Sequence, residues 1–172
     1  MTAATIPGDV VAHVLGLESG SYLASLRAER PEIVRQTQAT FLAIFEPDGD
    51  IGLSRTEREA VAIWVATLSR AAEVAAFHRS RLIALGTESE HLAPIGASVD
   101  ELKLSVRERA LLRHAEILTL RPATAEKLDT DALLNAEVEP AGIVALAQLV
   151  AFLSFEIRVI ATLKVLDREA GS

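Results

Sequence analysis

Glu59 and His78 are the two residues of this chain whose types best suit proton chemistry. A carboxylate that bonds an imidazole orients the ring, and the imidazole can then exchange a proton with a small molecule near neutral pH. The chain contains no cysteine. Peroxide reduction of the kind that cycles through thiolate, sulfenate and disulfide is therefore excluded.

Three residues shortly before His78 in the sequence, Ala71, Glu73 and Val74, are further candidates for the site. If Ala71, Val74 and His78 belong to one helix, they share a face within roughly 60°, because each residue turns the helix by about 100°. Ala71 and Val74 are then candidates for the wall of a substrate pocket. Glu73 is a candidate polar group in the same pocket, and a solvated helix face is the alternative for it.

The proposed pair sets a geometric condition on the chain. On one unbroken helix, Glu59 and His78, which are nineteen positions apart, would be separated by about 28 Å, so no proton could pass between them. The chain must therefore turn. Neither glycine nor proline interrupts the stretch between Leu53 and Gly86, and Ser69, as an N-cap, is the one sign of a break near Arg70.

Each member of the pair also has a structural interpretation. Glu59 suits a surface ion pair with Arg55 or Arg58, since charges three and four residues apart meet on a helix. His78 suits a histidine near the core that bonds a carbonyl group. The residues alone leave both interpretations open.

Arg158 is a further candidate for a pocket or for a structural role. Together with Glu156 it interrupts an otherwise apolar final helix. A buried arginine is rare unless paired, so we expect a carboxylate partner, either structural or in a cleft. No metal site is predicted, because metal-ligand spacing is missing from the other histidines, which are His13, His91 and His114.

The composition predicts an all-α fold. Half of the 172 residues are hydrophobic, and glycine, proline and aromatic residues are few, which favours helices over strands. Capping boxes begin helices at Ser54 and Ser105. Further helices are expected over residues 9–17, 22–30, 31–47, 122–128 and 131–137 and from Pro140 onward.

We expect one helical domain with an N-terminal arm. The loop at residues 46–50 separates an arm, residues 1–50, from a core, residues 51–170. The last helix is apolar on all sides from Ile143 to Phe155, so it must be covered by its own domain or by a neighbouring subunit.

The formal charge of −7 is spread along the chain without a basic cluster, which argues against nucleic acid as a partner. The longest uncharged run, Pro140–Phe155, is shorter than a membrane span, and the first nine residues do not resemble a signal peptide. We therefore expect no membrane partner and a cytoplasmic location.

The stretch from Leu53 to Gly86 resembles the core of the carboxymuconolactone decarboxylase and alkylhydroperoxidase D superfamily, and in particular its peroxidase-related subgroup. Glu59, Ala71, Val74, His78 and Gly86 stand where that family usually has Glu, Cys, Cys, His and Gly. The resemblance extends over roughly residues 31–166. It implies that Glu59 lies on a helix adjacent to that of His78, that the two form a proton relay, and that the chain assembles into a trimer or hexamer.

Two functions follow. The first is a cofactor-free acid–base enzyme or small-molecule binder that uses Glu59 and His78, as the decarboxylase branch of the superfamily works without thiols. The second is a redox-inactive oligomeric partner of a cysteine-containing relative. A solvent-connected pocket beside the pair would favour the first function. A dry contact at Ala71 and Val74 would favour the second.

Overall fold

The computed structural model describes residues 8–49, 52–86 and 98–170. This part of the chain is helical and has no strand, so the predicted all-α fold is confirmed. The α-helices are α1 (Val10–Leu15), α2 (Tyr22–Ala28), α3 (Pro31–Phe45), α4 (Arg55–Leu68), α5 (Ala72–Ala84), α6 (Val106–Leu120), α7 (Lys127–Asn135) and α8 (Pro140–Ala170). Two short 3-10 helices are η2 (Val99–Glu101) and η3 (Pro122–Thr124).

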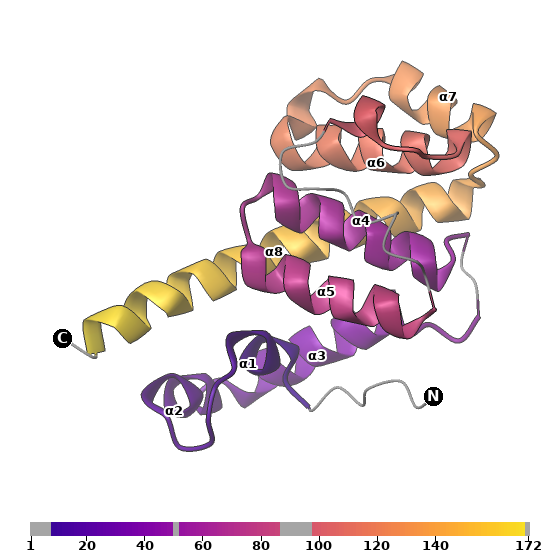
Figure 1. Cartoon of the computed structure of the whole chain (residues 1–172). Coiled ribbons are helices and arrows are strands. Elements are labelled where there is room, and N and C mark those ends of the chain that lie inside the picture. The colour runs from indigo at the N-terminus through magenta and orange to yellow at the C-terminus, as the bar shows by residue number, and fades with distance from the viewer. Residues whose placement is uncertain (1–7, 50–51, 87–97, 171–172) are drawn as a thin grey trace.

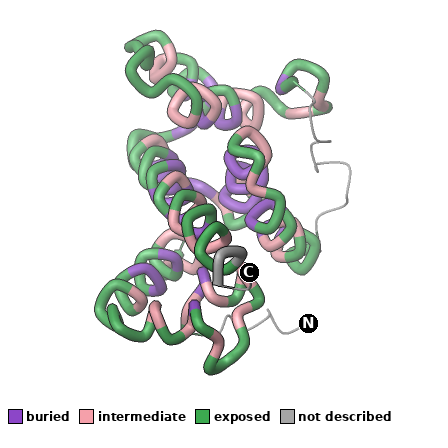
Figure 2. Tube along the Cα trace, turned by 90° about the vertical axis from the view of Figure 1, so that its left-hand side faces the viewer, coloured by how far each residue is buried: buried purple, intermediate pink, exposed green. Residues whose placement is uncertain are grey.

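Helix α4 lies at the centre of the molecule. It packs against α5, α6 and α8, and every residue from Val61 to Ala66 is buried. Helices α6 and α7 lie on one side of α4 and α5, and α1, α2 and α3 lie on the other, while the long α8 passes behind α4 and α5 (Figure 1). The buried parts of the chain therefore face inward between the helices (Figure 2).

One hydrophobic core runs through the described residues. It includes Val10 and Phe41 from the N-terminal helices as well as Trp64, Leu111 and Leu153 from the remainder. The arm therefore shares its packing with the rest of the fold. The predicted division into an arm, residues 1–50, and a core, residues 51–170, stays a prediction, because the hydrophobic core continues across residue 50.

Side-chain caps fix several helix starts as predicted. Ser54 with Glu57 and Ser105 with Glu108 both form capping boxes. The predicted helix at residues 122–128 is wrong, because Pro122–Thr124 is a single 3-10 turn and α7 begins at Lys127. The earlier start of α7 is stabilised by Asp129, whose Oδ2 accepts the amide of Glu126 at 2.8 Å.

The predicted turn near Arg70 is confirmed, but Ser69 is not its N-cap. Ser69 instead ends α4, and the amides of Arg70 and Ala71 donate to the carbonyls of Thr67 and Ala66 at 3.1 and 2.8 Å. This is a Schellman motif, in which glycine usually occupies the left-handed position. Here that position is Arg70, with φ of 56°. The motif folds α5 back against α4.

Two glycines allow α8 to begin close to the loop before α4. A Cβ on Gly52 would lie 2.4 Å from the amide nitrogen of Gly142, and a Cβ on Gly142 would lie 2.7 Å from the carbonyl oxygen of Gly52. Only glycine permits this backbone contact. The contact fixes the first turn of α8 next to the start of α4.

Helix α8 is longer than its uncharged run suggested. Residues Pro140–Asp167 are long and apolar enough to cross a membrane by length and composition. An 18-residue window within them has a mean hydropathy of 2.0, and 44% of that window is buried inside the fold. The core helix of a globular protein passes the same test. The contacts of α8 with α2, α3, α4 and α6 correspond to such a core helix.

Candidate functional site: a buried Glu59–His78 pair

Glu59 on α4 and His78 on α5 face each other across the two antiparallel helices. Glu59 Oε2 and His78 Nδ1 are 2.7 Å apart. A carboxylate accepts, so Nδ1 carries the proton in this bond, and Nε2 is left as the other ring nitrogen. The predicted hydrogen bond between the two residues is present. It depends on the turn at Arg70.

The same carboxylate also binds an arginine that the sequence analysis did not consider. Arg81 Nε donates to Glu59 Oε1 at 2.7 Å, and Arg81 Nη2 donates to Glu46 Oε1 at 2.7 Å. Arg55 pairs with the other oxygen of Glu46 at 3.2 Å. A chain of charge-assisted contacts therefore runs from the buried imidazole of His78 to the half-exposed Arg55.

Charge in this network is well compensated. Burial by itself lowers the pKa of Arg81, but the negative charge of Glu59 and the bonds to Glu46 and Glu59 outweigh it and raise that pKa above its usual value. Glu59 is 1% exposed, so the interpretation of Glu59 as a surface carboxylate is wrong. A fully buried carboxylate with a guanidinium partner and an imidazole partner is a stable arrangement.

Aromatic side chains enclose the imidazole. The ring of His78 lies 4.7 Å from Phe45 and 5.0 Å from Phe77, measured between centroids. The guanidinium of Arg81 lies 5.3 Å from the ring centroid of Phe41. His78 is 0% exposed, so no surface of its ring is open to a water-sized molecule in this conformation.

One atom of the site remains without a partner. His78 Nε2 is buried and makes no hydrogen bond. Buried polar atoms are nearly always paired, and an exception points to strain, to an unseen water or to a chemical role. The interpretation of His78 as a core histidine bonded to a carbonyl group is wrong, since its bonded nitrogen contacts a carboxylate.

The positions aligned with the family's two cysteines differ in exposure. Val74 is 0% exposed and belongs to the core. Ala71 is half-buried and lines a pocket of about 210 Å³ between the start of α5 and α8. Glu73 lines that pocket too and bonds Lys164. The contact at Val74 is therefore dry, and the pocket at Ala71 does not reach the Glu59–His78 pair.

Arg158 is not the buried arginine that the sequence predicted. Its side chain is exposed, and its Nη1 donates to the carbonyl of Ser154 at 2.8 Å. The direction of α8 turns Glu156 inward instead. Glu156 is 0% exposed, neither of its oxygens has a hydrogen-bond partner, and burial together with the charge of Asp9 raises its pKa to about 7.

Sequence reasoning missed Arg81 and Glu156 for different reasons. Arg81 follows His78 by three residues, so the helical spacing placed it on the same face and could have identified it. Glu156 carried no such signal, because both it and Arg158 interrupt the same apolar helix. Within the described ranges, no group of three or more His, Asp or Glu side chains could hold a metal ion.

Comparisons with known proteins identify the fold. The structure is similar to a peroxidase-related protein from Silicibacter sp. TM1040, with a TM-score of 0.71 and 19% identity over 78% of this chain and 69% of that one. It is equally similar to the alkylhydroperoxidase AhpD core of a peroxidase-related protein from Ralstonia eutropha JMP134, with a TM-score of 0.71 and 18% identity over 94% and 90% of the two chains. No family model and no curated protein matches the sequence. The fold expected from the sequence resemblance is confirmed.

Proposed function

We propose that this protein, an alkylhydroperoxidase D-like fold without cysteine, is a cofactor-free acid–base enzyme or small-molecule binder that uses His78. Glu59 orients the imidazole through Nδ1, and Nε2 exchanges a proton with the substrate. The observation that carries the proposal is the buried, unpartnered Nε2 of a histidine whose other nitrogen is held by a carboxylate. Val74 packs in the core and Ala71 lines a separate pocket, so neither takes part in the proton transfer.

The proposal requires the aromatic enclosure to open. Because His78 is 0% exposed, a substrate reaches Nε2 only when the side chains around it, Phe45 and Phe77 among them, move aside. An apolar enclosure favours neutral or weakly charged substrates, since a buried charge without a partner is costly. Small lactones, carbonyl compounds and protonated carboxylic acids fit this requirement.

The test is a screen of the purified protein against small lactones, carbonyl compounds and carboxylic acids, with binding and turnover as readouts. We expect His78→Ala to abolish any turnover. His114→Ala is the matched control, because His114 is also buried, also has an unpartnered ring nitrogen, and lies on α6. If the wild type neither binds nor converts any compound, or if His78→Ala behaves as the wild type does, the proposal is wrong.

A second candidate function is assembly without catalysis, as a redox-inactive oligomeric partner of a cysteine-containing relative. Two observations favour it: the enclosed imidazole of His78, and a groove between α3 and α8 of about 800 Å³ lined mainly by apolar residues. Ile33 and Phe155 in this groove are 52% and 44% exposed. Exposed apolar patches of this kind often mark protein contacts.

Sedimentation velocity tests the assembly. We expect a trimer or hexamer of the wild type and dissociation by Phe155→Glu. Val165→Glu is the control, since Val165 is 53% exposed on the same helix and does not line the groove. A monomeric wild type that also fails to associate with an added cysteine-containing protein of the same fold would contradict this candidate.

A further inference from the structure

A further cavity lies between α4 and α6, and Leu82 of α5 also contributes to its wall. Its volume is about 420 Å³. Its apolar wall is formed mainly by Ile63, Leu82, Leu104, Leu111 and Leu112. At about 30 Å³ for each water-sized group, it has room for roughly 10 to 14 non-hydrogen atoms. Small-molecule sites commonly have this size and this mostly apolar lining.

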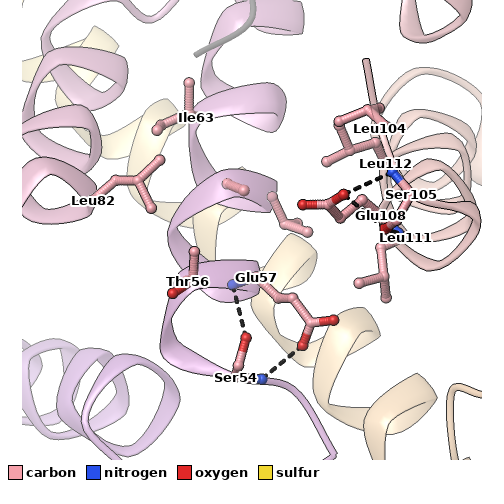
Figure 3. Close-up of a pocket in the computed structure, with 12 residues that line it drawn as sticks. Ser54, Thr56, Glu57, Ile63, Leu82, Leu104, Ser105, Glu108, Leu111 and Leu112 are labelled. Carbon is pink, nitrogen blue, oxygen red and sulfur yellow. Dashed lines mark hydrogen bonds between the residues drawn. The ribbon is translucent and has the colours of Figure 1, made fainter. Parts of the chain in front are cut away.

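The polar part of the cavity consists of two carboxylates and the hydroxyl groups of Ser54, Thr56 and Ser105. Figure 3 shows Glu57 from α4 and Glu108 from α6 extending into the space between the two helices. Both belong to capping boxes: Glu57 Oε2 accepts the amide of Ser54 at 2.7 Å, and Glu108 Oε2 accepts the amide of Ser105 at 2.8 Å. The caps hold the two carboxylates in fixed positions before any ligand arrives.

The polar groups at this end are mainly acceptors. Each carboxylate oxygen carries two lone pairs, so Glu57 Oε2, which accepts one cap bond, can accept another. Glu108 Oε2 already accepts both the amide and the hydroxyl of Ser105, at 2.8 and 2.7 Å, so Glu108 contributes its negative charge. Arg107 Nε donates to Glu57 Oε1 at 2.6 Å, which balances the charge of Glu57. A ligand that brings a hydrogen-bond donor is therefore complementary to this end of the cavity. An anionic ligand is not, because a carboxylate would face carboxylates.

The wall of the cavity is also close to the Glu59–His78 pair in the fold. Ile63 follows Glu59 by one helical turn on α4, and Leu82 follows His78 by one turn on α5. Both Ile63 and Leu82 are buried. A ligand in the cavity therefore contacts side chains that share helix faces with the pair, although it does not touch the pair itself.

We propose that the cavity between α4 and α6 binds a small organic molecule with an apolar body and a hydroxyl or ammonium group, with that group directed to Glu57 and lying near the negative charge of Glu108. The apolar body lies against Ile63, Leu82 and the leucines of α6. The proposal does not depend on proton chemistry at His78, and its readout is binding rather than turnover.

Three compounds with one carbon skeleton test the ligand class: 4-phenylbutan-1-ol, 4-phenylbutylamine and 4-phenylbutyrate. Calorimetry or ligand-observed NMR should show the alcohol and the amine binding with a Kd of about 1 mM or below, which is ordinary for about a dozen atoms. The carboxylate should bind at least about tenfold more weakly. No binding of the alcohol and amine, or equal binding of the carboxylate, would overturn the proposal.

Two variants locate the site. Ala60 lines the cavity, so Ala60→Phe should fill it and weaken binding of the alcohol at least about tenfold. Ala76→Phe, on the exposed face of α5, is the control and should bind as the wild type does. Glu108→Gln keeps a capping box, and it should weaken the amine at least about threefold while the alcohol is little changed.

Unchanged binding in both Ala60→Phe and Glu108→Gln would place the ligand elsewhere and would contradict the proposal. Should Ala60→Phe fail to fold, Glu108→Gln alone decides: a selective loss of the amine supports the site, and equal retention of amine and alcohol overturns it.

Discussion

Two fully buried carboxylates in this protein have opposite surroundings. Glu59 on α4 receives bonds from His78 and Arg81, each at 2.7 Å. Glu156 on α8 is just as buried, yet neither of its oxygens has a hydrogen-bond partner. Burial alone therefore does not decide the state of a carboxylate. The partners of the carboxylate decide it: Glu59 is bonded by an imidazole and a guanidinium, whereas burial without a partner favours the protonated form of Glu156 and raises its pKa to about 7.

The largest predicted effect comes from changing Glu59. Glu59→Gln leaves Arg81 beside an uncharged amide, so we expect the free energy of unfolding to fall by about 3 to 5 kcal/mol. Urea unfolding at pH 7 measures it. A loss below about 1 kcal/mol would show that the network around Glu59 contributes little to stability, and would remove half of the contrast with Glu156.

Glu156→Gln should change the free energy of unfolding in the opposite direction and raise it at pH 8. Because the pKa of Glu156 is raised from 4.5 to about 7 in the fold, its contribution to stability is full below pH 4.5 and is lost as the pH rises to about 7. The loss amounts to about 3 kcal/mol. Glu156→Gln should remove this loss and should be more stable than the wild type at pH 8 by up to that amount.

Urea unfolding of wild type and Glu156→Gln at pH 5 and pH 8 provides the measurement. The difference between the two proteins should grow with pH across this window. If the free energy of unfolding depends on pH equally in both proteins, Glu156 ionises freely in the fold. The contrast between Glu156 and Glu59 would then be wrong.

A smaller effect on stability is expected from backbone strain in the turn that joins the helices of Glu59 and His78. Arg70 has φ of 56° in the turn between α4 and α5, a conformation that costs an L-residue about 1 to 2 kcal/mol. Arg70→Gly should therefore raise the free energy of unfolding by about 1 kcal/mol, after the entropy of glycine is deducted. Ser69→Gly, at a residue with φ of −83°, should destabilise instead. Thermal denaturation distinguishes the two.

The smallest effect is expected at Arg158, two residues from Glu156. Its side chain is exposed and bonds a carbonyl of its own helix. Arg158→Ala should change the free energy of unfolding by less than about 0.5 kcal/mol at both pH 5 and pH 8. A pH-dependent fall in the free energy of unfolding of this variant would show that Arg158 interacts with Glu156. The description of Glu156 as a carboxylate without a partner would then be wrong.

The sequence predicted the local features well. Asp9 caps α1, and Ser54 and Ser105 begin α4 and α6 through capping boxes, since caps depend on residues three positions apart. The turn near Arg70 was also predicted, although the role of Ser69 was wrong. No glycine marks the left-handed residue of that turn, so the local pattern could not specify how α4 ends.

Contacts between distant segments were predicted less well. The hydrogen bond between Glu59 and His78 followed from the family resemblance. The ion pair of Arg81 with Glu46, 35 residues earlier, and the aromatic enclosure by Phe45 did not, since both depend on where the N-terminal helices pack. The buried residue on α8 was also assigned incorrectly. Arg158 and Glu156 differ by about 200° around the helix, and the sequence did not show which direction is inward.

The amino-acid sequence by itself determined that this protein is helical and carries no thiol, because both facts depend on residue types and near neighbours. Tertiary structure alone decided which carboxylate is paired, which is buried without a hydrogen-bond partner, and that the imidazole of His78 is enclosed. These properties depend on burial and on the direction of each helix face, which arise only when segments far apart in the chain pack together.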